Sequence, residues 1–292
     1  MDPPPVFYPI WLLDPAPLVD CVKRIARAGF DGVSFAAAPV NDPRRLDVLT
    51  PVQADALRQS LGAAGLDRTL HLLSDCYFAG EPHWSDALVR RVQQSIEACV
   101  RALAVPGLRP LVVSLDPICL PPGPQGALEP DLIVKMLSFL ADLSHRYNMR
   151  PAIENWPKPG VGTPEALGRL ISQAPGEVAI LLDLGHLHMA LSSGWCSRRS
   201  PADFVRALPA PVLEVHLHDN HGAVDEHLPP GEGTADLVGT LAALIAGGLD
   251  GPVTLECDLR PPGRPGLSEA AGRARQLIAE AAHRSAHARS DL

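Results

Sequence analysis

The fold class predicted from the sequence is α/β, a single (β/α)8 TIM barrel. Short apolar runs alternate with helical patterns along nearly the whole chain. Several runs, such as Val178–Leu182, are continuously apolar, which is typical of parallel strands buried on both faces. The alternation occurs eight times within 292 residues, close to the ~250 residues usual for one such barrel.

Eight apolar runs are expected to form the strands. They cover Val6–Leu13, Gly32–Ala37, Thr69–Leu73, Leu111–Leu115, Pro151–Asn155, Val178–Asp183, Val212–Asp219 and Pro252–Cys257. An open doubly wound sheet is the alternative. No G-x-G-x-x-G follows the first run, which removes the best cofactor signal of that fold.

Apolar residues at helical spacing fill the segments between the runs. The pattern over Leu18–Ala28 stops at Gly29, a usual end for a helix. Thr163 is expected to be an N-cap because Pro164 follows it at the first helical position. Three further helices are expected over Ser85–Leu103, Leu132–Tyr147 and Ala235–Ala246.

No linker interrupts this pattern, so residues 1–292 are expected to form one domain. The segment Pro117–Pro130, rich in proline and glycine, is expected to be a long loop on the active-site face. Ser285–Leu292 is mostly polar or small and is expected to fray.

Composition indicates a globular protein, with 46% hydrophobic and 20% charged residues. The net charge of −8 argues against nucleic acid as a partner. Six scattered cysteines without a C-x-x-C pair suit a reduced, cytoplasmic protein. The N-terminus does not resemble a signal peptide, and no apolar run reaches the ~18 residues of a membrane span.

Imidazole and carboxylate side chains stand at the C-terminal ends of the predicted strands, where a barrel carries its functional groups. An apolar strand that ends in a buried carboxylate needs a partner for that charge. A divalent cation would be such a partner, because imidazoles and carboxylates bind Zn, Mn, Co or Fe. These residues are His71, Glu154, Asp183, His186, His216, Asp219 and Glu256, and the loop after the seventh strand adds Asp225 and His227.

Each of these residues also has a structural interpretation when taken singly. Glu154 could be a capping or ion-pairing residue, His216 a core histidine, and Asp183 the N-cap of a following turn. Five strand ends that carry ligand-type side chains nevertheless favour one shared ion. The expected ligands are Glu154, Asp183, His216 and Glu256.

Five sequence blocks resemble the xylose isomerase-like TIM-barrel superfamily. That group contains sugar phosphate isomerases and epimerases, dehydratases and AP endonucleases of the endonuclease IV type. The resemblance runs from His71 to Glu256. The blocks are Ile153-Glu154-Asn155, Asp183-Leu184-Gly185-His186, His216-Leu217-His218-Asp219-Asn220, the segment from Asp225 to Gly233, and Leu255-Glu256.

The resemblance implies an enzyme of carbohydrate metabolism, a metal-dependent isomerase or epimerase for a small sugar or polyol. Glu154, Asp183, His216 and Glu256 would hold one divalent ion, which could be Mn, Zn, Co, Fe or Mg. Glu154 and Glu256 would also be catalytic. They would move a proton at a carbon beside a carbonyl, through an enediolate that the metal stabilises.

The endonuclease IV branch binds three zinc ions with a larger ligand set. This sequence matches that set at four further positions, which are therefore candidates for a second ion or for substrate binding. The histidine of the fourth strand is replaced by Ser114, a poor zinc ligand, and the segment His71–Phe78 contains no Lys or Arg to hold DNA. A dehydratase or lyase on the same site, a non-catalytic binding barrel and a homo-oligomer stay open. The four further positions are His71, His186, Asp225 and His227.

Three neighbours of the predicted ligands complete the expectations. Trp156 and Lys158 follow Glu154 and are candidates for the substrate pocket. His218 shares a face with His216 only if the seventh strand continues that far. Cys257 is expected to be a core thiol that points away from the metal.

Overall fold

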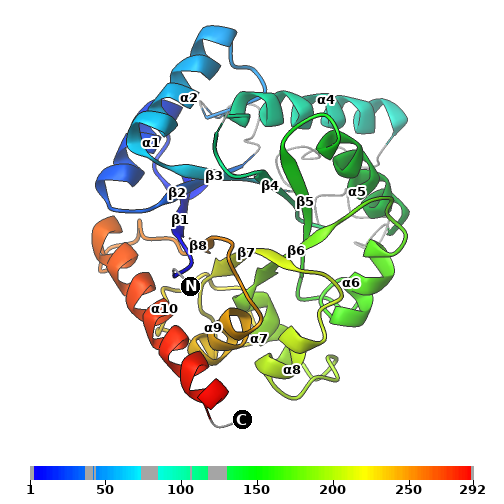
Figure 1. Cartoon of the computed structure of the whole chain (residues 1–292), viewed down its shortest axis with the longest axis vertical. Helices are drawn as coiled ribbons and strands as arrows, with labels where there is room; N and C mark the ends of the chain where they lie inside the picture. The colour runs from blue at the N-terminus through cyan, green and yellow to red at the C-terminus, as the bar shows by residue number, and fades with distance from the viewer. Residues whose placement is uncertain are drawn as a thin grey trace.

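Eight parallel strands close into a barrel in which each strand pairs with its neighbours in chain order and β1 pairs with β8 (Figure 1). The predicted fold class is therefore confirmed. The strands are β1 (Val6–Pro9), β2 (Gly32–Ala36), β3 (Asp67–Leu72), β4 (Leu111–Leu115), β5 (Met149–Glu154), β6 (Ala179–Asp183), β7 (Val212–Leu217) and β8 (Val253–Leu255).

This computed structural model describes residues 3–36, 42, 44–73, 85–105, 107–117 and 130–290. Most of the predicted loop Pro117–Pro130, residues 118–129, lies outside them. In the described part of the chain, no helix combines the length and the apolar character needed to cross a membrane.

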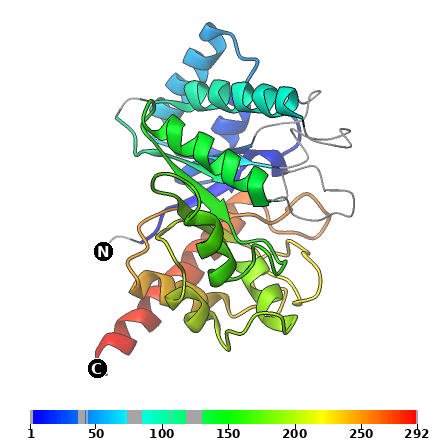
Figure 2. The same ribbon diagram turned by 90° about the vertical axis from the view of Figure 1, so that its right-hand side faces the viewer.

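Helices surround the barrel, and Figure 2 shows α4 and α5 lying across the outside of the strands. Both faces of the sheet are thus covered, which explains why most strands are buried at every residue. The helices are η1 (Ile10–Leu12), α1 (Leu18–Arg27), α2 (Pro51–Ala64), α4 (Asp86–Leu103), α5 (Pro130–Ser144), α6 (Pro164–Ile171), α7 (Leu184–Ser192), α8 (Pro201–Arg206), α9 (Leu237–Ala246) and α10 (Leu267–Ser290).

Local signals account for several helix starts. Thr163 caps α6 by accepting a hydrogen bond from the backbone N–H of Ala166, as predicted. Helix α2, absent from the expected helices, begins with a reciprocal capping box between Thr50 and Gln53. That box is legible in the sequence, because Thr at the N-cap and Gln three residues later form a known pair.

The expected ends of three segments are wrong. The first strand ends at Pro9, and the chain then turns through the short helix η1 instead of continuing to Leu13. The seventh strand ends at Leu217 and not at Asp219. The fraying expected from Ser285 does not occur through Ser290, because α10 packs along α9 and buries Ser285.

Alternation along the strands sends one set of side chains outward to the helices and the other into the barrel. A small apolar cluster fills the lower interior, and polar side chains occupy the level above it. Cys257 is buried, as expected of a core thiol. The interior apolar cluster consists of Val112, Ala152, Ala179, Leu181 and Leu213.

We predict that Gly32→Ala destabilises the barrel by ~1–3 kcal/mol, as overpacking does in other cores. Gly32 pairs with Phe7 across β1 and β2, and a Cβ atom on Gly32 would lie between 2.3 and 2.6 Å from three carbons of the Phe7 ring. Urea unfolding measures the change in free energy.

Gly62→Ala in α2 is the matched control, since a Cβ atom there meets nothing within 4 Å. It should stabilise the protein by ~0.5–1 kcal/mol, because alanine favours a helix interior over glycine. A Gly32→Ala protein as stable as wild type would contradict the packing described for the barrel.

Candidate metal centre

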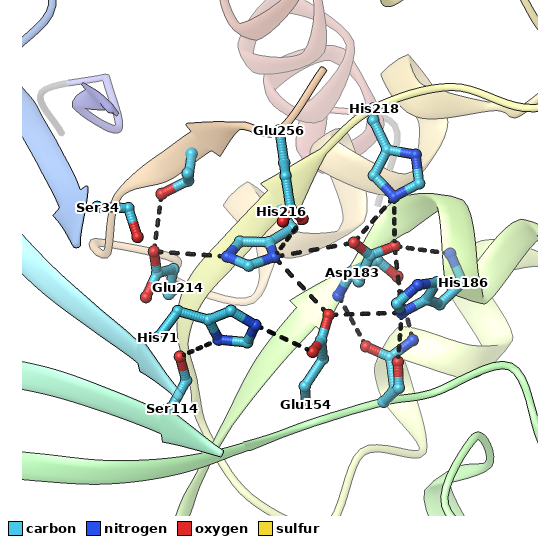
Figure 3. A network of polar contacts seen from close by, with 12 residues as sticks. Ser34, His71, Ser114, Glu154, Asp183, His186, Glu214, His216, His218 and Glu256 are labelled. Carbon is cyan, nitrogen blue, oxygen red and sulfur yellow. Dashed lines mark hydrogen bonds and ion pairs between the residues drawn. The ribbon is translucent and has the colours of Figure 1, made fainter. Parts of the chain in front are cut away.

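Four of the predicted ligand residues come from four consecutive strands at one end of the barrel (Figure 3). Glu154 ends β5, Asp183 ends β6, His216 is the last but one residue of β7, and Glu256 directly follows β8. Asp183 and His216 are register partners, so neighbouring strands bring these side chains to the same level of the barrel.

The four side chains converge on one imidazole nitrogen. Nδ1 of His216 lies 2.7 Å from Oε2 of Glu256 and 3.7 Å from Oε1 of Glu154. Oδ2 of Asp183 lies 3.9 Å from the same nitrogen. None of the four residues is more than 6% exposed. Three carboxyl groups and an imidazole thus surround one buried point.

Several atoms of this group lack the hydrogen bonds that buried polar atoms normally make. Within the described residues, Oε2 of Glu154 and both ring nitrogens of His216 have no hydrogen-bond partner. The short contact between His216 and Glu256 does not have hydrogen-bond geometry. Three carboxylate groups and one imidazole form a donor set that Mg, Mn, Zn, Co and Fe accept. The residues therefore fit a divalent cation.

The two glutamates differ in their electrostatic environments. Burial, reinforced by the nearby carboxylates of Asp116 and Asp183, raises the pKa of Glu154 well above its usual range. Burial also disfavours ionised Glu256, but the adjacent His216 holds the pKa of Glu256 well below its usual range. Burial disfavours the charged His216 ring, yet Glu256 raises the pKa of His216 to about 9. Glu154 therefore favours the acid form and Glu256 the carboxylate form.

A second group of ligand-type side chains lies beside the first. Nε2 of His186 and Nε2 of His227 lie 3.2 and 2.9 Å from Oδ2 of Asp225. The Nδ1 atoms of these two rings lie 2.9 and 2.8 Å from the backbone carbonyl oxygens of Asn155 and Glu256. An imidazole with one nitrogen on a carbonyl and the other turned to a carboxylate is the arrangement of many metal-ligating histidines.

His218 belongs to this second group. The sequence had left open whether its side chain shares a face with His216. Because β7 ends at Leu217, His218 leaves the strand alternation. Its Nε2 lies 3.0 Å from both carboxylate oxygens of Asp183, and its ring stacks on His227 with centroids 4.2 Å apart. A Cβ atom on Gly185 would lie 2.0 Å from the His218 ring, so the glycine of the D-L-G-H block admits this imidazole.

Backbone contacts hold Asp183 in place. The Asn155 side chain accepts a hydrogen bond from the Asp183 N–H at 2.7 Å and donates one to the Asp183 carbonyl at 3.1 Å. Asp183 is also the N-cap of α7, accepting from the His186 N–H at 2.6 Å. The structural interpretation of Asp183 and its expected place beside His216 are therefore compatible.

The loop that carries Asp225 and His227 is anchored by Asp219, whose carboxylate accepts from the backbone N–H groups of Gly231 and Ala235. His227 has a φ of 49°, a left-handed conformation that costs a non-glycine residue of order 1–3 kcal/mol. The two hydrogen bonds of its ring, to Asp225 and to the Glu256 carbonyl, compensate for this strain.

His71 lies on the other side of Glu154. Its Nε2 is 3.5 Å from Oε2 of Glu154, and its Nδ1 is 2.9 Å from the Ser114 hydroxyl. Burial, together with the neighbouring His216, lowers the pKa of His71 to about 3, so the ring is neutral at pH 7. Trp11, which the sequence interpretation missed, packs near His71 with ring centroids 5.8 Å apart.

The two candidates for the substrate pocket have different surroundings. Trp156 packs against His186 with ring centroids 4.6 Å apart. Lys158 is exposed, and the structure does not bring it to the imidazoles. Trp11 could have been noticed, because it lies near the C-terminal end of the first apolar run, Val6–Leu13.

A family described as xylose isomerase-like TIM barrel matches residues 22–279. Two uncharacterized proteins of Methanocaldococcus jannaschii are 31% and 27% identical over 128 and 101 residues, which is 41% and 35% of this chain. The matches span 41% and 37% of those proteins, less than half of either curated relative.

Solved structures share the fold over nearly the whole chain. A D-tagatose 3-epimerase-like protein is 20% identical, with a TM-score of 0.70 over 97% of this chain and 98% of its own. D-allulose 3-epimerase from Methylomonas sp., in complex with D-allulose, is 15% identical, with a TM-score of 0.68 over 96% and 98%.

A xylose isomerase-like TIM barrel protein from Mycobacterium smegmatis, solved in complex with magnesium, is 15% identical, with a TM-score of 0.66 over 97% of both chains. At these identities the solved structures support the fold alone. The family match covers most of the chain and includes every residue of both polar groups, which confirms the predicted resemblance. This chain belongs to the xylose isomerase-like TIM barrel family.

Proposed function

We propose that this protein is a divalent-metal-dependent isomerase or epimerase for a small sugar or polyol. The observation that carries the proposal is the meeting of Glu154, Asp183 and Glu256 at Nδ1 of His216. The names of the solved relatives, which include a D-allulose 3-epimerase in complex with its sugar, support the substrate class.

Glu154, Asp183, His216 and Glu256 would hold the ion. When bound, a divalent ion supplies Lewis-acid stabilisation of the negative charge that develops on substrate oxygens. The Mycobacterium smegmatis relative contains magnesium, and the same donor set also accepts Mn, Zn, Co or Fe. His216 and Asp183 have no further role in this proposal beyond holding the ion.

The proton transfer falls to the two glutamates. One glutamate takes a proton from the carbon next to the substrate carbonyl, and the other returns a proton to a carbon of the resulting enediolate. Figure 3 shows the two side chains approaching His216 from different directions, as proton transfer on opposite faces of a substrate requires. The reverse reaction exchanges the two roles.

The second polar group has two possible uses in this proposal. Two overlapping sets of ligand atoms lie close together, and His218 belongs to both: Asp183, His186 and His218 form one set, and His218, Asp225 and His227 the other. They fit a second cation, or they hold substrate oxygens by hydrogen bonds. Because Asp183 contacts His218, either use would be coupled to the first ion.

The nuclease alternative is weakened at one ligand position. Ser114 stands where the endonuclease branch has a histidine, and its hydroxyl lies against His71. A serine hydroxyl is a poor zinc ligand. A dehydratase or lyase would use the same two glutamates, and it would be recognised by a dehydrated product.

We predict that the protein, stripped with a chelator and reloaded with Mn²⁺ or Zn²⁺, binds at least one ion per chain. His216→Ala should abolish binding at the first site, because His216 contacts all three carboxylates. Elemental analysis after gel filtration measures the ratio. Two ions per chain would support a second site, and one ion under saturating metal would exclude it.

His283→Ala is the matched control for this experiment, since His283 is an exposed histidine on α10. It should bind as much metal as wild type. A wild-type protein that cannot be reloaded with any divalent ion contradicts the proposed function.

We predict that Glu154→Gln and Glu256→Gln each lower turnover by ~10²-fold or more, because the amide keeps the shape and cannot exchange a proton. Turnover is measured as deuterium incorporation from D2O into a panel of ketohexoses and polyols by NMR. Metal content is measured on the same samples, since glutamine is also a weaker ligand.

Glu97→Gln, on α4 and outside the site, is the control and should keep full activity. Substantial exchange by Glu256→Gln with its metal retained would exclude the assigned role. Cleavage of abasic DNA by the wild-type protein, without exchange into any sugar, would favour the nuclease instead.

A further inference from the structure

Glu214 is a buried carboxyl group directly below the candidate metal centre. It lies on β7 two residues before His216, so both side chains point into the barrel. Glu214 is 0% exposed. Nothing in the proposed proton transfer uses it.

Two threonines from other strands hold Glu214 in one orientation. Its Oε1 accepts hydrogen bonds from the hydroxyls of Thr69 on β3, at 2.9 Å, and Thr254 on β8, at 2.7 Å. The Ser34 hydroxyl lies 2.8 Å from the Thr69 hydroxyl and extends the polar layer to β2. Side chains from four strands thus form one polar layer beneath the ion site (Figure 3).

Two atoms of these neighbouring side chains lack hydrogen-bond partners. Among the described residues, neither Nε2 of His216 nor Oε2 of Glu214 has one. Nε2 of His216 lies 3.8 Å from Oε1 of Glu214, while Nδ1 of the same ring faces the three carboxylates above. A ring displacement of about 1 Å would bring Nε2 to hydrogen-bond distance from Glu214.

We propose that Glu214 is a positioning residue that prepares His216 to bind the metal. The Glu214 carboxyl oxygen accepts the hydrogen on Nε2, so that Nδ1 keeps its lone pair for the ion. A metal-binding histidine usually donates its other N–H to a carboxylate, a carbonyl or water, which orients the ring. This inference rests on the proposed function, because it assigns a partner to one of the four ligands.

A purely structural role explains the residue less well. The lower interior of the barrel is filled by apolar side chains, so space alone does not demand a carboxyl group. A buried carboxyl group with one unpartnered oxygen is costly unless another group compensates for it. Among the described residues, His216 is the candidate metal ligand that has an unpartnered nitrogen close to this layer.

The test compares the Co²⁺ affinities of chelator-treated wild type and Glu214→Gln. Binding is measured through the visible absorption of the bound ion. Glutamine keeps the volume of the side chain and removes the carboxylate. The expected result is ~10–100-fold weaker binding, as for other residues that orient a metal ligand. His216→Ala identifies the absorption that belongs to this site, and Glu97→Gln, on α4 and outside the site, should bind like wild type.

Urea unfolding of the metal-free proteins separates positioning from structure. Metal-free Glu214→Gln should be as stable as wild type or more stable, because glutamine removes a carboxyl group whose ionisation is disfavoured by burial. Lower metal-free stability with unchanged Co²⁺ affinity would overturn the positioning role. Should Glu214→Gln fail to fold, Thr254→Val removes one of the two hydroxyls that hold Glu214. It should weaken Co²⁺ binding in the same direction, and unchanged binding would overturn the inference.

The outcomes distinguish this inference from the proposed function. If Glu214→Gln and wild type bind Co²⁺ with the same affinity, the role of Glu214 is overturned and the proposed metal centre is unaffected. Wild type that binds no Co²⁺ would overturn the metal centre, and the role of Glu214 with it.

Discussion

The cluster of buried carboxyl groups at one end of the barrel is the constraint on which the rest of this site depends. Glu154, Asp183 and Glu256 lie around a single imidazole nitrogen, in surroundings that are almost completely shielded from solvent. Carboxylates so close together repel one another and lose their hydration, so each needs a compensating charge or hydrogen bond. Burial and the nearby carboxylates raise the pKa of Glu154, whereas the adjacent His216 outweighs burial and lowers the pKa of Glu256.

The surrounding structure maintains the cluster through contacts with the backbone. The Asn155 side chain forms hydrogen bonds with the backbone N–H and carbonyl of Asp183. The Asp219 carboxylate accepts hydrogen bonds from two backbone N–H groups of the following loop. Gly185 leaves room for the ring of His218, and His227 tolerates a left-handed backbone. Gly185 and His227 favour the arrangement of charged groups at some expense of local stability, which is typical of functional sites.

The barrel supports this end of the molecule with layers of different chemistry. Apolar side chains such as Val112 and Leu181 fill the lower interior, and the polar layer around Glu214 separates them from the candidate ligand residues. Glu214 lies between the apolar interior cluster and the candidate metal centre. A carboxyl group at this depth can act on His216 from below without exposure to substrate or solvent.

Local sequence was enough to predict the alternation of strands and helices, the closed barrel and the polar residues at the strand ends. Burial on both faces imposes continuous apolar runs, and these runs end at the polar residues. Local sequence was not enough for the position of His218, which depends on β7 ending at Leu217, one residue before His218. The contact between Glu214 and the threonines of β3 and β8, and the packing of Trp11 near His71, likewise join residues far apart in the chain. Such contacts arise from strand register and barrel closure, which are properties of the whole sheet and leave no local pattern in the sequence.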